Sequence, residues 1–176
     1  ERIDGRVRAM GHVHSLLSDS HWTALGLRSL ITAIAPAEFI KRITIEGDEV
    51  PIGARQVTGL AMVMHELMTN SVKHGALATP TGTVSIRWTE FENRGTIKRG
   101  LEIRWREQGG PAVNSQPTPS VGMELVAGLT RSELGGEARL TFPPGGADHT
   151  LTITLDDPNA GEFALRRGSS IQNGAT

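Results

Sequence analysis

The 176-residue sequence contains no cysteine and no tyrosine. The absence of cysteine excludes thiolate metal sites, disulfide bonds and thiol nucleophiles, and agrees with a reducing compartment. No apolar run approaches the roughly 18 residues that a membrane-spanning helix needs. Eighteen lysines and arginines oppose nineteen aspartates and glutamates, so no overall charge attracts nucleic acid or an anionic membrane. We therefore expect a cytoplasmic protein with no nucleic-acid partner and no membrane contact, whose partners are selected by local sites.

Several common catalytic motifs are also absent. The sequence has no phosphate-binding G-x-x-x-x-G-K-[ST] or G-x-G-x-x-G loop, and no H-R-D motif combined with D-F-G. His65-Glu66 begins the zinc-protease pattern H-E-x-x-H, but Thr69 occupies the position of the second histidine. These absences exclude the commonest nucleotide-binding and zinc-hydrolase classes.

The segment 65–75 is the most informative part of the chain. At about 100° per residue, four polar side chains fall within an arc of about 100° on one side of a helix. They are Glu66, Asn70, Lys73 and His74. Apolar or small residues occupy the opposite side, namely Val57, Leu60, Ala61, Met64, Leu67, Met68, Ser71 and Val72. One side of the predicted helix therefore gathers a carboxylate, an amide and two potential cations.

This combination suits a metal-bridged polyphosphate. An amide oxygen can ligate Mg²⁺, cations can neutralise phosphate oxygens, and a carboxylate can orient or deprotonate a nucleophile. The alternative is a solvated polar face on a surface helix. Two features weigh against it: Asn70 is a poor interior helix former, and Gly75 stands where the helix would end, so that the cations lie in its last turn.

Hydrophobic periodicity predicts the order of the elements. We expect a helix that contains Trp22, Leu25 and Leu30 and ends at Pro36, a strand at 42–46 that turns at Gly47-Asp48 into a short segment at 50–52, and the motif helix at 55–74. Strands at 84–88 and 101–105, a proline-interrupted loop at 111–121, a helix at 123–134 and a hairpin at 137–142 and 150–155 follow. This order predicts an α+β fold, a two-layer sandwich in which helices cover one face of a mixed sheet.

The two ends of the chain have patterns of their own. Ile3, Val7, Met10, His14 and Leu17 recur at heptad spacing, and such a helix needs a partner to bury its apolar stripe. We expect residues 1–21 to be the end of a helical bundle that forms a homodimer, within a longer protein; a helix packed on its own domain is the alternative. Residues 156–176 are expected to be a disordered tail.

Two motifs together resemble those of a known family. The first is His65-Glu66-Leu67-x-x-Asn70-x-x-Lys73-His74-Gly75-Ala76-Leu77, and the second is Trp105-x-Glu107-x-Gly109-Gly110-Pro111. The pair resembles the HWE family of bacterial sensor histidine kinases, and the likeness extends from Arg2 to about Leu155. It implies the ATP-binding fold shared with gyrase and MutL over residues 22–155, preceded by the second helix of a dimerisation bundle.

By this likeness, ATP and Mg²⁺ would be the ligands of the helix described above. Asn70 would ligate Mg²⁺, Lys73 and His74 would meet the phosphates, and Glu66 would take the place of a general base. Gly122 would lie near the phosphates of the nucleotide, where relatives carry a G-x-G before the last helix. Only this one glycine of the G-x-G is present here.

The second motif would hold the base of the nucleotide. Glu107 would accept a hydrogen bond from the adenine amino group, where relatives place Asp. Gly109 and Gly110 would let the backbone approach the base, because they lack a Cβ. Thr150 would offer a hydroxyl near adenine, and residues 111–121 would form a mobile lid.

The resemblance implies that the γ-phosphoryl group of ATP is transferred to a histidine and relayed to the receiver domain of a response regulator. The family's acceptor pattern, such as H-R-V-K-N, does not occur here, and His12 and His14 match the second bundle helix. We therefore expect the acceptor to lie upstream. Three other functions stay open: a gyrase- or MutL-type ATPase with Glu66 as base, a degenerate phosphotransfer scaffold that no longer binds nucleotide, and an anti-sigma serine kinase.

Overall fold

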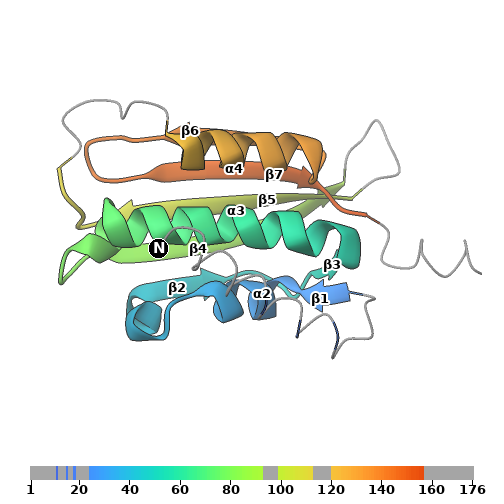
Figure 1. Cartoon of the computed structure of the whole chain (residues 1–176), viewed down its shortest axis with the longest axis horizontal. Coiled ribbons are helices and arrows are strands. Elements are labelled where there is room, and N and C mark those ends of the chain that lie inside the picture. Colours follow the sequence, from blue (N-terminus) through green and yellow to red (C-terminus); the bar gives the residue numbers. More distant parts are fainter. Residues whose placement is uncertain are drawn as a thin grey trace, which may run out of the picture.

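The computed structural model describes residues 24–92, 99–112 and 120–156, together with Gly11, Ser15 and Ser18. Its helices α2 (Leu27–Ile34), α3 (Ala54–Lys73) and α4 (Val121–Ser132) lie side by side across one face of a β-sheet (Figure 1). The predicted two-layer α+β architecture is therefore confirmed.

Within the described residues, five strands form the main sheet in the order β2-β4-β5-β7-β6. Their bounds are β2 (Ile43–Glu46), β4 (Thr83–Glu92), β5 (Arg99–Gln108), β6 (Glu137–Thr141) and β7 (Asp148–Thr154). β2 is parallel to β4, and the other neighbours are antiparallel. The sheet is mixed, as predicted, and the expected final hairpin is formed by β6 and β7.

The alternation of side chains along each strand decides which residues face the helices. In β5, Trp105 and Glu107 are both buried and share the phase that points toward the helical layer. In β7, His149 and Leu151 are buried in the same way. The core layer between sheet and helices is apolar over most of its length, but Glu107 and His149 bring polar groups into it at one end.

α3 lies in the centre of the helical layer (Figure 1). Its apolar side is buried, as the helical period predicts. The helix ends where Gly75 was expected to end it: the His74 N–H donates to the Asn70 carbonyl at 2.8 Å, and the Gly75 N–H donates to the carbonyls of Asn70 and Ser71 at 3.0 and 3.1 Å. The prediction of a helix over 55–74 is confirmed to within one residue at each end.

The loop after α3 is fastened to the sheet. This loop contains a short 3-10 helix, η2 (Ala76–Ala78). Arg42, the last residue of a second 3-10 helix, η1 (Ala37–Arg42), binds the loop. The Arg42 guanidinium donates to the carbonyls of Leu77, Thr79 and Gly82 at 3.2, 2.5 and 3.0 Å. The Thr79 hydroxyl donates to the Gly109 carbonyl at 2.7 Å. These contacts fix the end of α3 relative to the ends of β4 and β5.

The first part of the domain differs from the prediction. Leu25 lies in a short strand, β1 (Ala24–Gly26), and the helix begins only at Leu27; Trp22 lies outside the described residues. β3 (Pro51–Gly53) pairs with β1 in a separate two-stranded antiparallel sheet. The short segment predicted at 50–52 after the turn at Gly47-Asp48 is therefore a strand, and it pairs with β1 and not with β2.

The physical reason for this difference is a contact at the turn. Gly47 has a φ of 151° and packs directly against the indole ring of Trp88. The same indole donates its N–H to the Asp48 carbonyl at 2.7 Å. The turn at Gly47 and Asp48 is therefore held over Trp88 of β4. The residues after the turn consequently do not pair with β2.

Little of either end of the chain is described. Gly11, Ser15 and Ser18 have helical backbone and are exposed. The rest of the predicted bundle helix and residues 157–176 lie outside the described residues.

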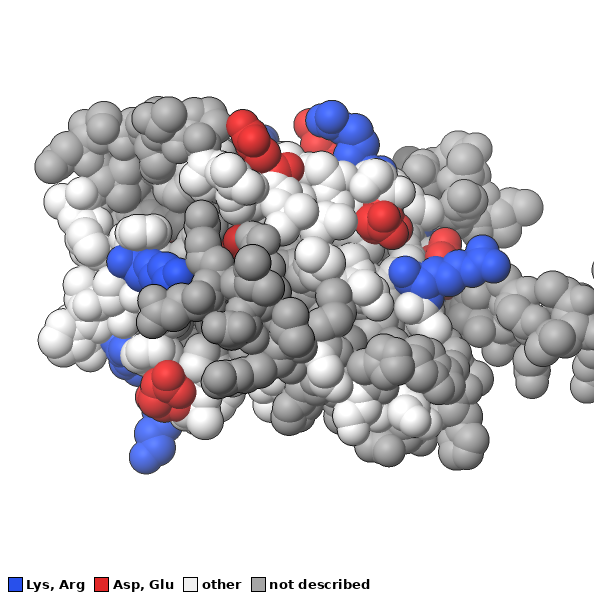
Figure 2. All heavy atoms as spheres, in the orientation of Figure 1, with Lys and Arg blue, Asp and Glu red and all other residues white. Residues whose placement is uncertain are grey.

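Acidic and basic side chains are interspersed on the face shown in Figure 2 and form no large patch of one sign among the described residues. No helix in the described part of the chain has the length and apolarity needed to cross a membrane.

Candidate functional site

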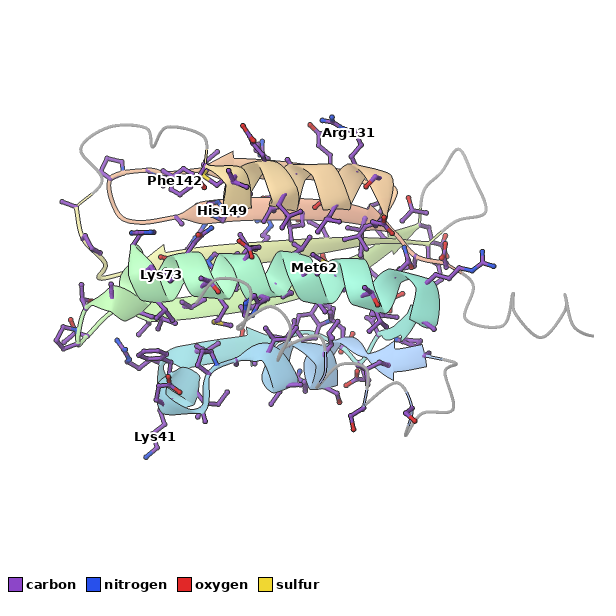
Figure 3. The ribbon with its side chains drawn as sticks, in the orientation of Figure 1. Lys41, Met62, Lys73, Arg131, Phe142 and His149 are labelled. Atoms are coloured by element: carbon purple, nitrogen blue, oxygen red, sulfur yellow. The ribbon has the colours of Figure 1, made fainter. Side chains whose placement is uncertain are left out.

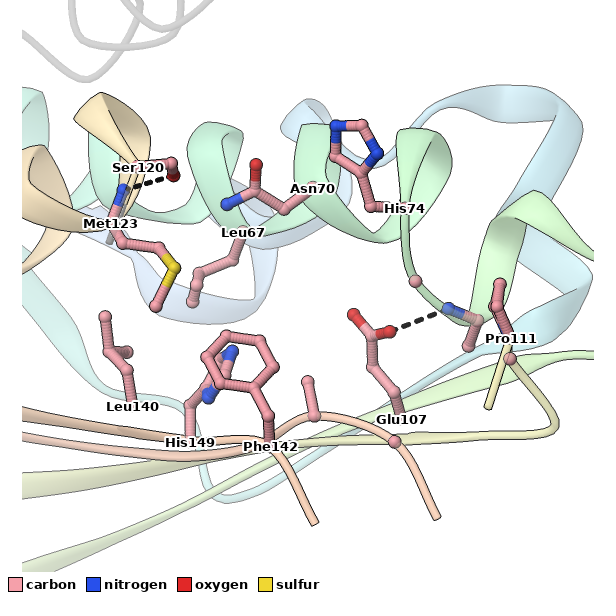
Figure 4. Close-up of a pocket in the computed structure, with 15 residues that line it drawn as sticks. Leu67, Asn70, His74, Glu107, Pro111, Ser120, Met123, Leu140, Phe142 and His149 are labelled. Atoms are coloured by element: carbon pink, nitrogen blue, oxygen red, sulfur yellow. Dashed lines mark hydrogen bonds between the residues drawn. The ribbon is translucent and has the colours of Figure 1, made fainter. Parts of the chain in front are cut away.

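A cavity of about 300 Å³ lies between the helical layer and one end of the sheet. The second half of α3, the loop after it, the ends of β5 and β7, the β6–β7 hairpin and the start of α4 bound it (Figure 4). Its lining residues are Leu67, Asn70, His74, Gly75, Ala76, Glu107, Gly110, Pro111, Ser120, Met123, Leu140, Phe142, Gly146, Ala147 and His149. Apolar side chains with a few convergent polar groups are typical of small-molecule sites.

Glu107 is the buried carboxylate of this cavity, with 5% of its surface exposed. Its Oε2 accepts a hydrogen bond from the Ala76 N–H at 2.7 Å, and its Oε1 accepts one from the Trp105 indole N–H at 3.0 Å. Each carboxylate oxygen has a second lone pair, so Glu107 can still accept a hydrogen bond from a ligand. The carboxylate therefore joins β5 to the loop after α3 while it faces the cavity.

Glycines surround this carboxylate because there is no room for side chains. A Cβ at Gly75 would collide with Glu107 Oε2, and a Cβ at Gly110 would lie 3.0 Å from the backbone of Ala76. Gly146 has a φ of 128°, and a Cβ there would lie 2.6 Å from the Glu107 carbonyl oxygen. The backbone thus packs closely around Glu107, and residue 110 has no room for a side chain.

The polar side of α3 faces the cavity only in part. Asn70, half-buried, and His74, exposed, line it. Glu66 is buried one turn earlier, next to the start of α4: a Cβ at Gly122 would lie 2.8 Å from Glu66 Oε2 and 3.8 Å from Asn70 Oδ1. Lys73 is exposed and is not among the lining residues, although it lies at the same end of the molecule as the cavity (Figure 3).

Two of the predicted base-binding residues occupy other places. Thr150 is on the opposite face of the sheet, because it lies between His149 and Leu151, which face the helices, and its cross-strand neighbours Arg104 and Arg139 are exposed. The expectation that its hydroxyl approaches the cavity is therefore wrong. Gly109 does not line the cavity either; its φ of 71° serves the turn that follows β5.

His149, and not Thr150, is the residue of β7 that lines the cavity. Its imidazole rises from β7 into the cavity beside Phe142, with ring centroids 5.0 Å apart and an interplanar angle of 71° (Figure 4). Burial lowers its pKa from 6.5 to about 4, and the backbone of Asp148, the Asp148 carboxylate and the backbone of Thr141 oppose this shift only partly. His149 is therefore neutral at pH 7.

The lowered pKa of His149 predicts acid sensitivity. As the pH falls below 6.5, the unfolded chain binds a proton at His149 before the folded chain does, so folding stability is lost between pH 6.5 and about 4. The loss attributable to this group is about 3 kcal/mol near pH 4. Urea unfolding at several pH values should show a smaller acid loss for His149→Phe than for wild type, and parallel pH profiles for the two proteins would contradict the prediction.

Other lining residues were missed by the sequence analysis. Strand alternation from Leu151 and Ile153 could have placed His149 inward. No sequence signal marks Leu140 or Phe142, which reach the cavity through the β6–β7 hairpin.

The start of α4 was also placed differently from the prediction. Ser120 caps the helix by accepting a hydrogen bond from the Met123 N–H at 3.3 Å, so α4 begins two residues earlier than expected. Of the predicted lid at 111–121, residues 113–119 lie outside the described residues. Within the part of the chain that is described, no cluster of three or more His, Asp or Glu side chains could hold a metal ion.

Comparisons with known proteins identify relatives over most of the chain, although no family model matches it. It is 34% identical over 149 residues to a blue-light-activated histidine kinase of Brucella anthropi, which covers 83% of this chain and 30% of the relative. It is 30% identical over 166 residues to blue-light-activated histidine kinase 1 of Erythrobacter litoralis, and 31% identical over 159 residues to a blue-light-activated histidine kinase of Rhizobium johnstonii. Each of these alignments covers 90% of this chain and 44% of the relative.

Solved structures give the same result for the fold. The histidine kinase domain of a blue-light activated histidine kinase from Erythrobacter litoralis matches with a TM-score of 0.68 at 18% identity, over 88% of this chain and 75% of that one. The catalytic domain of histidine kinase ThkA matches with a TM-score of 0.54 at 14% identity, over 76% of this chain and 96% of that one. The chain spans less than half the length of the curated relatives it matches. Over this span, it belongs to the HWE-type histidine kinases and corresponds to their ATP-binding catalytic portion.

Proposed function

We propose that this chain is the ATP-binding catalytic domain of a two-component sensor histidine kinase, which transfers the γ-phosphoryl group of ATP to a histidine outside it. The observation that carries the proposal is the convergence of Glu107, Asn70 and His74 on one cavity. Asn70 and His74 approach from α3, and Glu107 rises from the sheet toward them (Figure 4). A cavity that combines a buried carboxylate, an amide and a potential cation suits a nucleotide with a metal-bound phosphate tail.

The base is proposed to lie over the sheet beside Glu107. Leu67, Met123, Leu140 and Phe142 provide an apolar lining there, which suits the flat faces of a purine. The Glu107 carboxylate would accept a hydrogen bond from the adenine amino group. Close backbone packing at Gly110 keeps this part of the cavity free of side chains that would displace the base.

The phosphates are proposed to extend toward the end of α3 and the start of α4. His74 lines the cavity there, and exposed Lys73 lies one residue away. The first turn of the 12-residue helix α4 comes close to Asn70 at Gly122, and a helix N-terminus favours anions. Mg²⁺, when bound through the Asn70 amide oxygen, would neutralise phosphate charge.

The proposed reaction breaks the bond between the γ-phosphorus and the β–γ bridging oxygen and forms a bond from phosphorus to an imidazole nitrogen. ADP leaves, and the proton on the other ring nitrogen passes to a base. Glu66 is the proposed carboxylate for this role, because it lies beside Gly122 and Asn70 at the phosphate end. The protein contributes mainly by positioning the two reactants.

The proposed partners are a second copy of the protein and the receiver domain of a response regulator. The heptad pattern of residues 1–21 supports a bundle helix that forms a homodimer. Gly11, Ser15 and Ser18 lie off the apolar heptad positions, and their helical, exposed backbone agrees with that pattern.

Labelled ATP tests the proposed function. We expect this chain to bind Mg-ATP in calorimetry, and the full-length protein that contains it to incorporate γ-phosphate label that is lost in acid and stable in base, as phosphohistidine is. Steady ATP hydrolysis with no labelled protein, abolished by Glu66→Ala, would instead support a gyrase- or MutL-type ATPase. No binding heat would support a scaffold without nucleotide.

A further inference from the structure

His149 lies in the cavity but has no part in the roles proposed above. Its side chain is 5% exposed. Among the described residues, its Nδ1 is the one buried side-chain nitrogen or oxygen without a hydrogen-bond partner. Buried polar atoms are nearly always paired, so an unpaired one in a folded protein requires an explanation.

The imidazole is held next to Glu107. In the register of β5 and β7, His149 lies opposite Trp105, and the Glu107 N–H donates to the Ala147 carbonyl at 2.8 Å. Glu107 and His149 are therefore diagonal neighbours on one face of the sheet, roughly 7 Å apart. The edge-on contact with Phe142 fixes the ring from the other side. Both polar side chains reach the same part of the cavity (Figure 4).

The surroundings of the ring determine where its proton lies. Nδ1 has no acceptor in hydrogen-bond geometry among the described residues. In the neutral tautomer with its proton on Nε2, the buried Nδ1 is not a donor without an acceptor, although the backbone of Asp148 and Thr141 lies close enough to the ring to raise its pKa. Nε2 is the nitrogen farther from the backbone, and the ring projects from the sheet into the cavity (Figure 4). In that tautomer, His149 presents a donor beside the acceptor of Glu107.

We propose that His149 is a second base-recognising residue, whose Nε2–H donates to a ring nitrogen of adenine while Glu107 accepts from the adjacent amino group. This inference rests on the proposed function and adds to it a contact that specifies the base. The adenine amino group has a ring nitrogen with a lone pair on either side, so a neighbouring acceptor and donor match this edge. Guanine has a carbonyl oxygen in place of the amino group, and the Glu107 carboxylate repels it.

The test measures binding by calorimetry for wild type and for His149→Phe, which keeps an aromatic ring of similar size in the core. The ligands are Mg-ATP, Mg-1-deaza-ATP, Mg-7-deaza-ATP and Mg-tripolyphosphate. We expect His149→Phe to weaken ATP binding roughly tenfold, which corresponds to the loss of one hydrogen bond, and to leave tripolyphosphate binding unchanged. One of the two deaza analogues lacks the ring nitrogen that His149 contacts, and it should bind wild type roughly tenfold more weakly than ATP does. His149→Phe should bind that analogue and ATP with equal affinity.

Thr150→Val is the matched control, because Thr150 is the next residue of β7 and faces away from the cavity. It should bind all four ligands as wild type does. Equal effects of His149→Phe on ATP and tripolyphosphate would overturn the inference and leave the proposed function standing. Failure of wild type to bind Mg-ATP would overturn both.

A measurement on wild type alone guards against a variant that fails to fold. The ¹⁵N resonances of the His149 ring should report a neutral imidazole with its proton on Nε2, and the Nε2 resonance should shift when ATP saturates the chain. Wild type that binds ATP and both deaza analogues equally, with an unmoved Nε2 resonance, would also overturn the inference.

Discussion

Asn70→Ala is expected to weaken Mg-ATP binding by more than roughly 100-fold, since even outer-shell partners of a bound metal change its affinity by about 10- to 100-fold and Asn70 is the proposed direct ligand. Asn70 lines the cavity on the polar side of α3, and its Oδ1 lies near the start of α4 at Gly122. Phosphate transfer by the full-length protein should fall below detection. Asn70→Asp should also fail, because the added charge repels the phosphates.

The fold should survive the change at Asn70. The side chain of Asn70 makes no hydrogen bond to another described residue, and alanine is a better helix former than asparagine. The thermal midpoint of Asn70→Ala should therefore equal or exceed that of wild type. Thr69→Ala, one residue earlier in α3 and outside the lining of the cavity, provides the control. Mg²⁺-dependent ATP affinity equal to that of wild type would remove Asn70 from the metal site.

Glu107→Ala is expected to abolish ATP binding and also to destabilise the protein by about 3 kcal/mol or more, because two buried donors lose their acceptor. The donors are the Ala76 N–H and the Trp105 indole N–H. Loss of ATP binding by this variant alone therefore cannot separate a contact to the base from a local change of structure. Urea unfolding measures the second effect, and an unchanged free energy of unfolding would contradict the structural role.

Glu107→Gln separates the two roles. A glutamine keeps one oxygen acceptor for one of the two buried donors and replaces the other oxygen by an NH₂ donor, so it should destabilise less than alanine does. Its NH₂ group cannot accept from the adenine amino group, and its remaining oxygen is an uncharged acceptor that forms a weaker hydrogen bond than a carboxylate does. We therefore expect Glu107→Gln to weaken Mg-ATP far more than Mg-tripolyphosphate in calorimetry. Equal losses for the two ligands would count against an adenine contact.

Glu107 links the proposed base site to the end of α3. The carboxylate holds the Ala76 N–H, and Ala76 follows His74 and Gly75 directly in the chain. The proposed base-binding carboxylate therefore also positions the residues that end α3, where the phosphates are proposed to lie. Gly75 permits this contact, because any side chain there would meet Glu107 Oε2.

Much of the fold could be predicted from the sequence. The 3.6-residue period placed α3 to within one residue at each end, and two-residue alternation identified β4, β5 and the β6–β7 hairpin. These features depend on neighbours a few residues apart, which the sequence displays directly. Asn70, His74, Glu107 and Gly110, which the family resemblance assigns to one site, line one cavity, whereas Lys73, Gly109 and Thr150 do not line it.

The errors arose where partners are distant in the chain. The sequence predicts a short segment after the turn at Gly47-Asp48 but not its partner, β1, and the turn at Gly47 packs on Trp88. Thr150 was chosen for its hydroxyl, although its neighbour His149 is the residue that faces the helices. Neighbouring residues of a strand face opposite sides of the sheet. A functional residue that is assigned without knowing which residues face the helices can therefore be wrong by one position.

The sequence by itself determined the helices and most strands, the polar stripe of α3 and the kinship with histidine kinases, because periodicity and motif spacing are properties of nearby residues. The tertiary structure alone decided that Glu107 holds the loop after α3, that Nδ1 of His149 is buried without a partner, and that β1 and β3 form their own sheet. Those outcomes depend on close packing between residues far apart in the chain, where a single Cβ or a one-residue change of phase determines which groups meet.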